Sequence, residues 1–476
     1  MPKKNSFCYL AVGGVVLALA ACKTPALVGP TTTRSVPGQY DTLRDSVNAG
    51  KLSRRAFFTD PHLTALIDTA LRHNQELSIM LQEIQVSQND IRVRTGEYLP
   101  FVGLQAGAGF DKVGEYTRPG AIERSTEVAP GKPFPNPLPD FLLSANASWQ
   151  VDIWNKLHNA KRAAVARYLA SVEGRNFTIT NLVAELANAY YELLALDSQL
   201  DIIKKNIDIQ TNALEIVKVQ KEAAKVTELA VRRFEAQVLH TKSLQFDVQQ
   251  RIVETENRIN FLAGRFPQPV PRSTQDFGTL TPQLVQAGTP GQLLQNRPDV
   301  RQAERELEAA RLDVQVARAN FLPSLTVSAS VGLNAYNPLT LFSPQSLLYS
   351  LVGGLARPLI NRNAITALYY SANARQIQAV YNYERITLNA YMEVANQLAR
   401  IGNLQKSYDL KARQVEALMQ STSISNTLFR SARADYMEVL LTQRDALESR
   451  FDLVENKMQQ LHAMVNTYRA LGGGWQ

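Results

Sequence analysis

The feature that most constrains this chain of 476 residues is a strict alternation of apolar and polar side chains, in a sequence otherwise typical of helix. After Pro323, residues 324–334 read SLTVSASVGLN, with leucine, valine or alanine at every odd position and serine, threonine, glycine or asparagine at every even one. A period of two predicts a strand with one apolar and one polar face. Proline cannot continue a helix interior, so Pro323 predicts the junction at which a helix ends and a strand begins.

An earlier segment has the same layout. Pro100 precedes FVGLQAGAGF, residues 101–110, in which every even position is apolar and glycine or glutamine fills the later odd positions. Each strand has a candidate return partner, residues 143–152 for the first and residues 347–357 for the second, where the alternation is weaker. The sequence therefore predicts an internal duplication, in which a helix, a hairpin and long helices occur twice.

The four predicted strands suit a membrane better than a soluble core. Strands of about 9 to 11 tilted residues match the hydrocarbon layer, and one continuous apolar face opposite a small polar face is typical of a membrane β-barrel. A soluble β-sandwich has the same period, but four strands cannot form the core of a chain this long. An open sheet in lipid would leave two unpaired edges, which is costly, so several copies must share one barrel. Two copies would give eight strands and three would give twelve, and the residues leave that choice open.

The rest of the chain is predicted to be mainly helical. A run without proline over residues 155–221 would extend roughly 100 Å as a helix, and its leucines and isoleucines from Leu182 onward follow the 4-3 spacing of a coiled coil. Such seams indicate packing between antiparallel helices. The other predicted helices cover residues 61–98, 228–262, 290–321, 362–419 and 435–471.

The N-terminal residues predict export and lipid attachment. Lys3 and Lys4 precede a short apolar run over residues 10–20, which predicts a signal peptide over residues 1–21. Small residues directly before Cys22 are typical of a bacterial lipobox, so Cys22 is the expected lipid attachment site, acylated for instance with palmitate. Two acyl chains would suffice for stable anchoring. The alternative is an ordinary signal peptide followed by an incidental cysteine.

Several function classes are disfavoured by the composition. The later sequence has no run of about 18 apolar residues, so no transmembrane helix is expected. A net charge of +8 without a basic, aromatic-rich cluster disfavours nucleic-acid binding. Cys8 and Cys22 are the only cysteines, so neither a disulfide framework nor a zinc site is expected, and no cofactor is predicted. Because no nucleophile elbow or metal-ligand spacing occurs, the chain is not predicted to be an enzyme.

Seven segments in their order resemble the outer-membrane efflux proteins of the TolC type, in the lipoprotein branch that serves RND-type tripartite drug efflux systems. The resemblance covers nearly the whole mature chain. The segments are SWQVDIWNKLHNAKRAA, LLQNRPDVRQAERELEAAR, NFLPSLTV, ARPLINR, TLNAYMEVANQLA, RADYMEVLLTQRDAL and YRALGGGW.

The resemblance implies a homotrimer with a 12-stranded β-barrel in the outer membrane, continuous with an α-helical barrel in the periplasm. It also implies a periplasmic adaptor protein and an inner-membrane RND-type transporter as partners. The protein would then be a passive exit duct for drugs or other small molecules. The alternative within the same architecture is the outer-membrane duct of a type I protein secretion system.

Together, the pattern and the resemblance predict a division of the chain. The expected parts are a signal peptide (1–21), a lipid-anchored segment near an equatorial belt (22–60), a first repeat (61–265) with hairpin 101–152, an equatorial linker (266–289), a second repeat (290–471) with hairpin 324–357, and a C-terminal tail (472–476).

The resemblance also implies a gate, because in this family the tips of the long helices close the duct. Two turns here, residues 222–229 and 429–441, match those tips. Ala224 and Ala432 stand where glycine is usual, and Leu441 where the family often has an acidic residue. Glu438 is then a candidate constriction acid; the alternative is a set of solvated helix-tip charges. The gate candidates are Thr227, Glu228, Arg433, Asp435 and Glu438.

Overall fold

The computed structural model describes residues 25–27, 37, 40, 48–273, 277–282, 286–357, 360, 362–431 and 433–476. Contacts divide the chain into two compact units. Of the described residues, the first unit includes those within Gln85–Tyr168 and Arg305–Val380, and the second those within Leu169–Glu304 and Tyr381–Gln476 together with residues 48–84. The predicted signal peptide and Cys22 lie outside the described residues.

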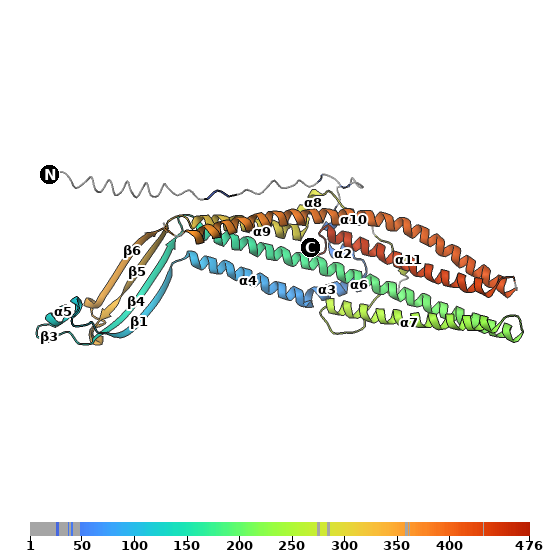
Figure 1. Cartoon of the computed structure of the whole chain (residues 1–476), viewed down its shortest axis with the longest axis horizontal. Coiled ribbons are helices and arrows are strands. Elements are labelled where there is room, and N and C mark those ends of the chain that lie inside the picture. The colour runs from blue at the N-terminus through green and yellow to red at the C-terminus, as the bar shows by residue number, and fades with distance from the viewer. Residues whose placement is uncertain are drawn as a thin grey trace. The chain divides into compact units, whose positions relative to one another are not determined.

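The first unit contains a four-stranded sheet in the order β1-β4-β5-β6, with every neighbouring pair antiparallel (Figure 1). This confirms the four predicted strands, although β4 begins earlier than expected. The prolines at which two strands were predicted to begin also lie as expected, Pro100 directly before β1 and Pro323 directly before β5. The strands are β1 (Phe101–Asp111), β4 (Leu138–Val151), β5 (Ser324–Ala335) and β6 (Leu347–Ala356).

The register of the sheet places the predicted apolar positions on one face. Ala106, Leu143, Leu333 and Leu347 lie opposite one another across the four strands. Side chains alternate between faces along each strand, so this pairing brings all the apolar positions of the alternation to the same side. Leu348 pairs with a glycine of the polar set, as its place in the alternation predicts.

The loops of the hairpins contain more structure than the sequence predicted. The loop between β1 and β4 contains α5 (Arg118–Ser125) and a small ladder of β2 (Glu127–Ala129) with β3 (Lys132–Pro133). Thr117 accepts a hydrogen bond from the backbone N–H of Gly120 and so caps α5. The loop between β5 and β6 forms two short 3-10 turns, η3 (Pro338–Thr340) and η4 (Pro344–Ser346).

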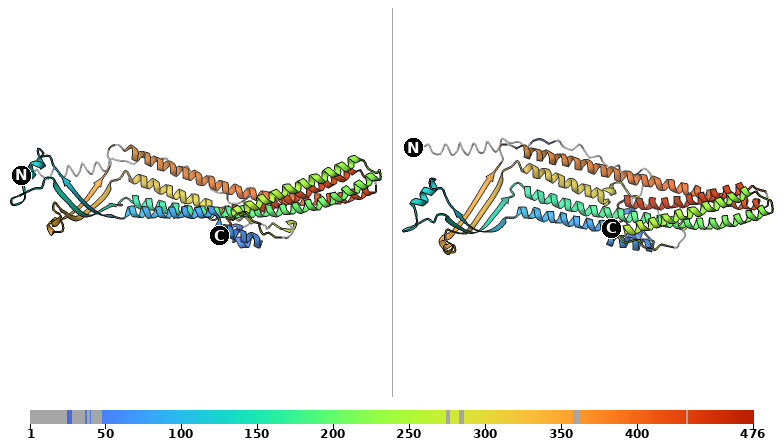
Figure 2. Two further views of the ribbon diagram at one scale, coloured as in Figure 1. Left: turned by 90° about the horizontal axis from the view of Figure 1, so that it is seen from below. Right: turned by 60° about the horizontal axis from the view of Figure 1, so that its bottom comes forward.

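Long antiparallel helices dominate the second unit (Figure 2). Along α6 (Lys156–Glu222) lies α7 (Glu228–Leu262), joined by a hydrogen bond from Thr241 to the side chain of Gln210. Along α10 (Asn363–Arg430) lies α11 (Tyr436–Ala470), joined by an ion pair of Lys411 with Asp452 at 2.6 Å. These are the two predicted helical hairpins. Among the described residues, none of the helices is both long and apolar enough to cross a membrane.

The predicted coiled-coil seam forms the core of the second unit. The seam residues of α6 belong to one buried cluster with residues of α3 (Pro61–His73), α7 and α11. Each fully buried leucine contributes roughly 1.5–3 kcal/mol to the stability of the fold. Other short elements complete this unit: η1 (Ala49–Lys51), α2 (Arg54–Phe57), η2 (Phe277–Thr279) and α8 (Gly291–Asn296). The buried seam residues are Leu182, Leu186, Ala189, Leu193, Leu196 and Ile203.

Two predicted helices are interrupted. The helix expected over residues 61–98 is divided at Asn74, whose side chain accepts from the N–H of Leu77 and donates to the carbonyl of Leu262 at 3.0 Å. Asn74 therefore caps a new helix, α4 (Gln75–Tyr98). The helix expected over residues 290–321 is likewise two, because Arg297 is extended before the proline that starts α9 (Pro298–Ala319).

The predicted end of the third long helix near residue 419 was wrong, since α10 continues to Arg430. The extension is rich in serine and threonine, which usually favour turns. Here Ser421 and Thr422 donate to the carbonyls of Ala417 and Leu418, four residues earlier, at 2.9 and 2.8 Å. Their hydroxyl groups are satisfied inside the helix and do not end it.

Candidate functional site

One face of the sheet presents large apolar side chains to the outside of the chain. Leu104 is 86% exposed and Tyr349 is 82% exposed. Monomeric soluble proteins rarely expose a contiguous apolar surface of this kind. The face therefore requires a neighbour other than water. Its other exposed members are Val102, Phe110, Leu143, Trp149, Val331, Leu347, Leu351 and Leu355.

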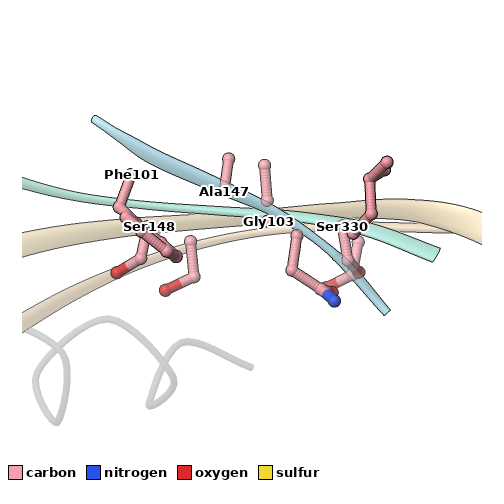
Figure 3. A pocket seen from close by; sticks show the side chains of 10 residues that line it. Phe101, Gly103, Ala147, Ser148 and Ser330 are labelled. Atoms are coloured by element: carbon pink, nitrogen blue, oxygen red, sulfur yellow. The ribbon is translucent and has the colours of Figure 1, made fainter. Parts of the chain in front are cut away.

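The opposite face consists mainly of small polar side chains. Gly103, Asn146, Ser330 and Ser350 form one row across the four strands. Asn146 donates from Nδ2 to the side-chain oxygen of Gln105 at 3.3 Å. A hollow of about 500 Å³ lies against this row, and Figure 3 shows the hydroxyl-bearing side chains on the side opposite to Ala147. A surface of small hydroxyl and amide groups is easily wetted and leaves space beside it.

The sheet has two open edges. In the described part of the chain, β1 pairs only with β4 and β6 pairs only with β5. Backbone N–H and C=O groups along the outer side of each edge strand need partners, and in hydrocarbon each unsatisfied group costs several kcal/mol. The sheet is incomplete as a membrane structure unless other strands join both edges.

Two tryptophans fix the helix-to-strand junctions at the predicted prolines. Trp149 donates its indole N–H to the carbonyl of Tyr98, the last residue of α4, at 3.1 Å. Trp154 donates to the carbonyl of Pro323 at 2.7 Å. The carbonyl of Tyr98 is at the C-terminal end of a helix and would otherwise need water or a cap. The sequence segment SWQVDIWN thus has a structural role that its pattern did not reveal.

Asp152 starts the long helix at the same end of the sheet. Its carboxylate accepts from the backbone N–H of His158 and contacts the ring of His158, both at 2.8 Å. Burial opposes the charged form of Asp152, but the hydrogen bonds from His158 and the first turn of α6 prevail and hold its pKa below the ordinary value. Asp152 therefore anchors α6 as a carboxylate.

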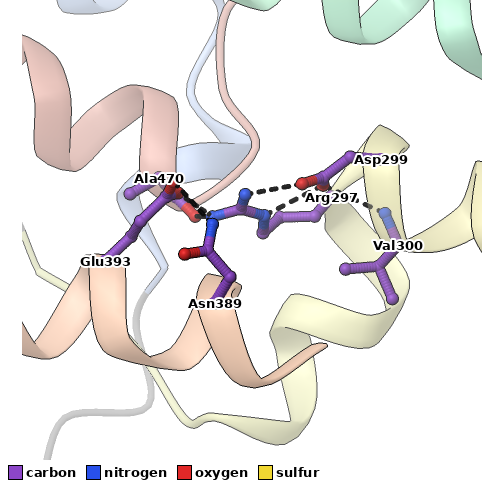
Figure 4. Close-up of polar contacts among 6 residues, drawn as sticks. All are labelled: Arg297, Asp299, Val300, Asn389, Glu393 and Ala470. Carbon is purple, nitrogen blue, oxygen red and sulfur yellow. Dashed lines mark hydrogen bonds and ion pairs between the residues drawn. The ribbon is translucent and has the colours of Figure 1, made fainter. Parts of the chain in front are cut away.

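The second unit contains a buried charge cluster at the break between α8 and α9, which we call the Arg297 cluster (Figure 4). Arg297 donates to both oxygens of Asp299 at 3.0 and 2.7 Å, to Glu393 at 2.8 Å and to the carbonyl of Ala470 at 2.9 Å. Its side chain is only 4% exposed. The cluster joins the α8–α9 junction, α10 and the end of α11. Residues Arg297, Asp299, Glu393 and Ala470 define it.

The C-terminal glycines pack next to this cluster. Gly472 has φ +83°, and a Cβ atom there would lie 2.6 Å from the carbonyl oxygen of Asn296. Only glycine fits both the backbone conformation and the space. The guanidinium carbon of Arg301 lies over the ring of Trp475, 5.8 Å from the ring centroid. The segments RPDV, AYMEVAN and ALGGGW therefore meet in space, which sequence reasoning did not predict.

The sequence model of the family described as "Outer membrane efflux protein" matches residues 66–265 and 289–473, which include every α-helix and β-strand described above from α4 to α11. The chain belongs to the outer membrane efflux protein family. This confirms the resemblance seen in the sequence and places the chain among outer-membrane efflux channels, which are not enzymes.

Relatives of this outer membrane efflux protein match along almost their whole length. The pyoverdine export outer membrane protein OpmQ of Pseudomonas aeruginosa is 27% identical over 419 residues, 88% of this chain and 86% of the relative. The cation efflux system protein CusC of Escherichia coli is 26% identical over 469 residues, 97% and 98% of the two chains. The toluene efflux pump outer membrane protein TtgI of Pseudomonas putida is 25% identical, over 93% and 92%.

Solved structures show the same fold. The open state of the MtrE outer membrane channel of Neisseria gonorrhoeae superposes with a TM-score of 0.83 at 22% identity, over 96% of this chain and 99% of that one. A structure of CusC superposes with a TM-score of 0.82 at 23% identity, over 94% and 100%. The mainly helical fold with a modest sheet is therefore that of the TolC-type channels, as predicted.

In this outer membrane efflux protein the tips of the two helical hairpins pack against each other. Val439 of α11 is buried among Val217 of α6 and Phe234 of α7, and Phe234 lies 6.5 Å from the ring of Phe429. Ala224, predicted to replace a glycine, has φ 56°, a conformation that favours glycine. The residue corresponding to it in the other tip, Ala432, lies outside the described residues.

The gate candidates divide into two groups. Thr227 is the N-cap residue of α7 without a side-chain cap, and Glu228 beside it pairs with Lys221 and Arg232, both at 2.8 Å. The hydrogen bond from Lys221, with the charges of Lys221 and Arg232, lowers the pKa of Glu228.

The second group lies at the other tip. Asp435 is the N-cap residue of α11, Glu438 is in its first turn, and Arg433 is on the preceding turn. All three are exposed, and within the described residues none forms an ion pair. The structure thus brings Arg433, Asp435 and Glu438 to one tip without pairing them inside the chain. Leu441 on the same helix is 41% exposed.

Proposed function

We propose that this protein is the outer-membrane channel of a tripartite efflux system, a passive exit duct for drugs or other small molecules. An inner-membrane RND-type transporter would deliver them through a periplasmic adaptor. The observation that supports this best is the four-stranded sheet, with its exposed apolar face, its mainly polar opposite face and its two open edges. In a barrel, the apolar face contacts lipid and the polar face lines water.

The open edges support a shared barrel. Closure removes both edges, which no single copy can do with four strands. Three copies would supply twelve strands, enough for a lumen, whereas the interior of an eight-stranded barrel is filled by side chains. We therefore propose a homotrimer with a 12-stranded barrel, with the long helices of the three chains forming an α-helical barrel in the periplasm.

The named relatives favour small molecules over proteins as cargo. The names of these relatives refer to pyoverdine export, toluene efflux and cation efflux. We propose the same kind of transport here, in preference to protein secretion. Attachment through a lipid at Cys22 and the division into two repeats joined by a linker over residues 266–289 belong to the same proposal.

The second group of gate candidates fits a closed state held between copies. Arg433, Asp435 and Glu438 are exposed at one tip and have no ion-pair partner among the described residues of their own chain. Each is available to a neighbouring copy. An adaptor would open the gate only by binding the open state better than the closed one, because a ligand shifts an equilibrium by its differential affinity.

The test is a strain in which the gene is deleted, assayed for sensitivity to drugs, dyes and detergents. We expect increased sensitivity, restored by the wild-type gene, and conductance from the purified protein in planar lipid bilayers. A Cys22→Ala variant separates the anchor from the pore: it should lose acylation while the purified protein still conducts. Unchanged sensitivity to every compound, together with a stable single copy lacking conductance, would contradict the proposal.

A further inference from the structure

A cavity of about 740 Å³ lies in the second unit between α6, α10, α11, η2 and the residues Arg272 and Ser273. We call it the anion cavity. Its apolar and aromatic lining includes Leu194, Ile202, Phe277, Tyr408 and Leu453. Polar and charged side chains share the lining about equally with these apolar ones, so the cavity can contact both a polar group and an apolar body of one small molecule. This cavity is not lined by the residues described above for the two faces of the sheet, the tips of the helical hairpins or the Arg297 cluster.

Four cations line the anion cavity, and two of them are neutralised by carboxylates. Lys205 pairs with Asp201 at 2.6 Å. Arg272 pairs with Asp197 at 2.5 Å and also contacts Glu256. These pairs account for both aspartates of the lining.

The other two cations, Arg450 and Lys457, are not neutralised. Within the part of the chain that the structure describes, no carboxylate lies within ion-pair distance of either. Lys457 is only 7% exposed, and its ammonium lies 4.9 Å from the ring centroid of Tyr408. Burial lowers the pKa of Lys457, and it lowers the pKa of Arg450 although the charge of Asp201 acts in the opposite direction. Burying a charge is costly unless it is paired, and Lys457 has an aromatic ring beside it but no carboxylate among the described residues, so an anion is the partner that this ammonium lacks.

We propose that this cavity binds an organic anion, a carboxylate or sulfonate attached to an apolar body, with the acidic group between Arg450 and Lys457. The apolar body lies against Leu194, Ile202 and Tyr408. An ion without such a body would leave most of the lining unfilled. Because the site joins α6 of the first repeat to α11 of the second, the bound anion stabilises the contact between them.

The test is a binding titration of para-(trifluoromethyl)benzoate with the full-length protein in a neutral detergent. Fluorine NMR detects the bound probe. The uncharged para-(trifluoromethyl)benzamide and inorganic sulfate serve as comparison probes, with protein-free micelles as the blank. We expect saturable binding of the benzoate, tighter than that of the amide or of sulfate. Equal binding of benzoate and amide, or no saturation, would overturn the proposal.

Matched variants locate the site. Lys457→Met and Arg450→Met should each weaken benzoate binding about tenfold or more, because a hydrogen bond to a charged group contributes roughly 1.5–3 kcal/mol. Lys411→Met removes a cation of the same helical hairpin that is already paired with Asp452, outside the cavity, and should leave binding unchanged. An equal loss in the Lys411→Met protein would contradict the assignment.

A second readout separates binding from a structural role. Without ligand, Lys457→Met should unfold at the same or a higher temperature than the wild type, because it removes a buried charge that has the Tyr408 ring but no described carboxylate beside it. A clear destabilisation would mean that Lys457 serves packing and not binding. Arg450→Met tests the same site independently of Lys457. Binding is measured without transport, so failure here leaves the efflux proposal intact, and failure of efflux leaves this one intact.

Discussion

In the sheet of the first unit, large apolar side chains face away from the chain, whereas in the second unit a group of charges is withdrawn from solvent around Arg297. The Arg297 cluster is complete within one chain, since its guanidinium has carboxylates and a carbonyl as partners. The sheet is not complete, because both of its edges are open. The comparison indicates which part folds on its own contacts and which part depends on lipid and neighbouring copies.

The largest effect is expected from Arg297→Met. It would leave two partly buried carboxylates, those of Asp299 and Glu393, without their cation. Breaking a buried pair typically costs about 3–5 kcal/mol. Denaturant unfolding of the purified protein measures this loss. Arg305→Met is the control, because the one ion pair of Arg305 among the described residues is an exposed one with Glu308, and its loss should cost about 1 kcal/mol or less. Similar losses in both variants would refute a special role for the cluster.

A smaller effect is expected from Leu351→Arg in β6, on the apolar face of the sheet. An arginine facing lipid near the midplane costs about 2–4 kcal/mol, so the variant should assemble poorly in the outer membrane. Ser350→Arg, the adjacent residue on the polar face, should assemble and change only conductance. Membrane fractionation with conductance measurements distinguishes the two. If Leu351→Arg assembled as well as Ser350→Arg, the apolar face would not be the lipid-facing one.

Next in size is Gly472→Ala beside the Arg297 cluster. The added methyl group would approach the carbonyl of Asn296 at a backbone conformation that favours glycine, at a cost of about 1–3 kcal/mol. Gly402→Ala on α10 meets no atom within 4 Å and should stabilise the helix by roughly 0.5–1 kcal/mol. Thermal unfolding of the two variants should shift in opposite directions, and equal shifts would count against close packing of the tail.

The smallest effect concerns pH at the end of the sheet. The lowered pKa of Asp152 means that its carboxylate stabilises the fold fully above the ordinary aspartate pKa of about 3.9, and that this stability is lost as the pH falls through the lowered value. Asp152→Asn should therefore reduce stability at neutral pH and flatten its loss in acid. Unfolding curves from neutral to acidic pH measure this, and an unchanged acid dependence would contradict it.

The strands and long helices could be predicted because their signals are local. Alternation after Pro100 and Pro323 shows which side chains share a face, and the 4-3 spacing on α6 identifies its buried seam. The break at Asn74 was missed because it depends on a hydrogen bond to the carbonyl of Leu262, far away in the sequence. The continuation of α10 was missed because serine and threonine satisfy their hydroxyls inside the helix.

The polar clusters could not be predicted for a related reason. Arg297 lies 96 residues from Glu393 and 173 residues from Ala470, so no window of sequence contains them together. From the sequence, Arg450 and Lys457 are indistinguishable from the exposed charges of a surface helix. Their burial depends on helices that are distant in the sequence. The sequence shows an arginine directly before a proline at residues 297 and 298, but this local pattern specifies neither its burial nor its partners.

The antiparallel order of the sheet has a consequence for assembly. Four strands of alternating direction leave β1 and β6 running in opposite directions at the two edges. Any ring of identical copies then repeats one antiparallel seam at each junction, whether the number of copies is odd or even. A chain that contributed three strands could close an odd ring only with a parallel seam. Freedom to use three-fold symmetry is thus built into the parity of the strand count.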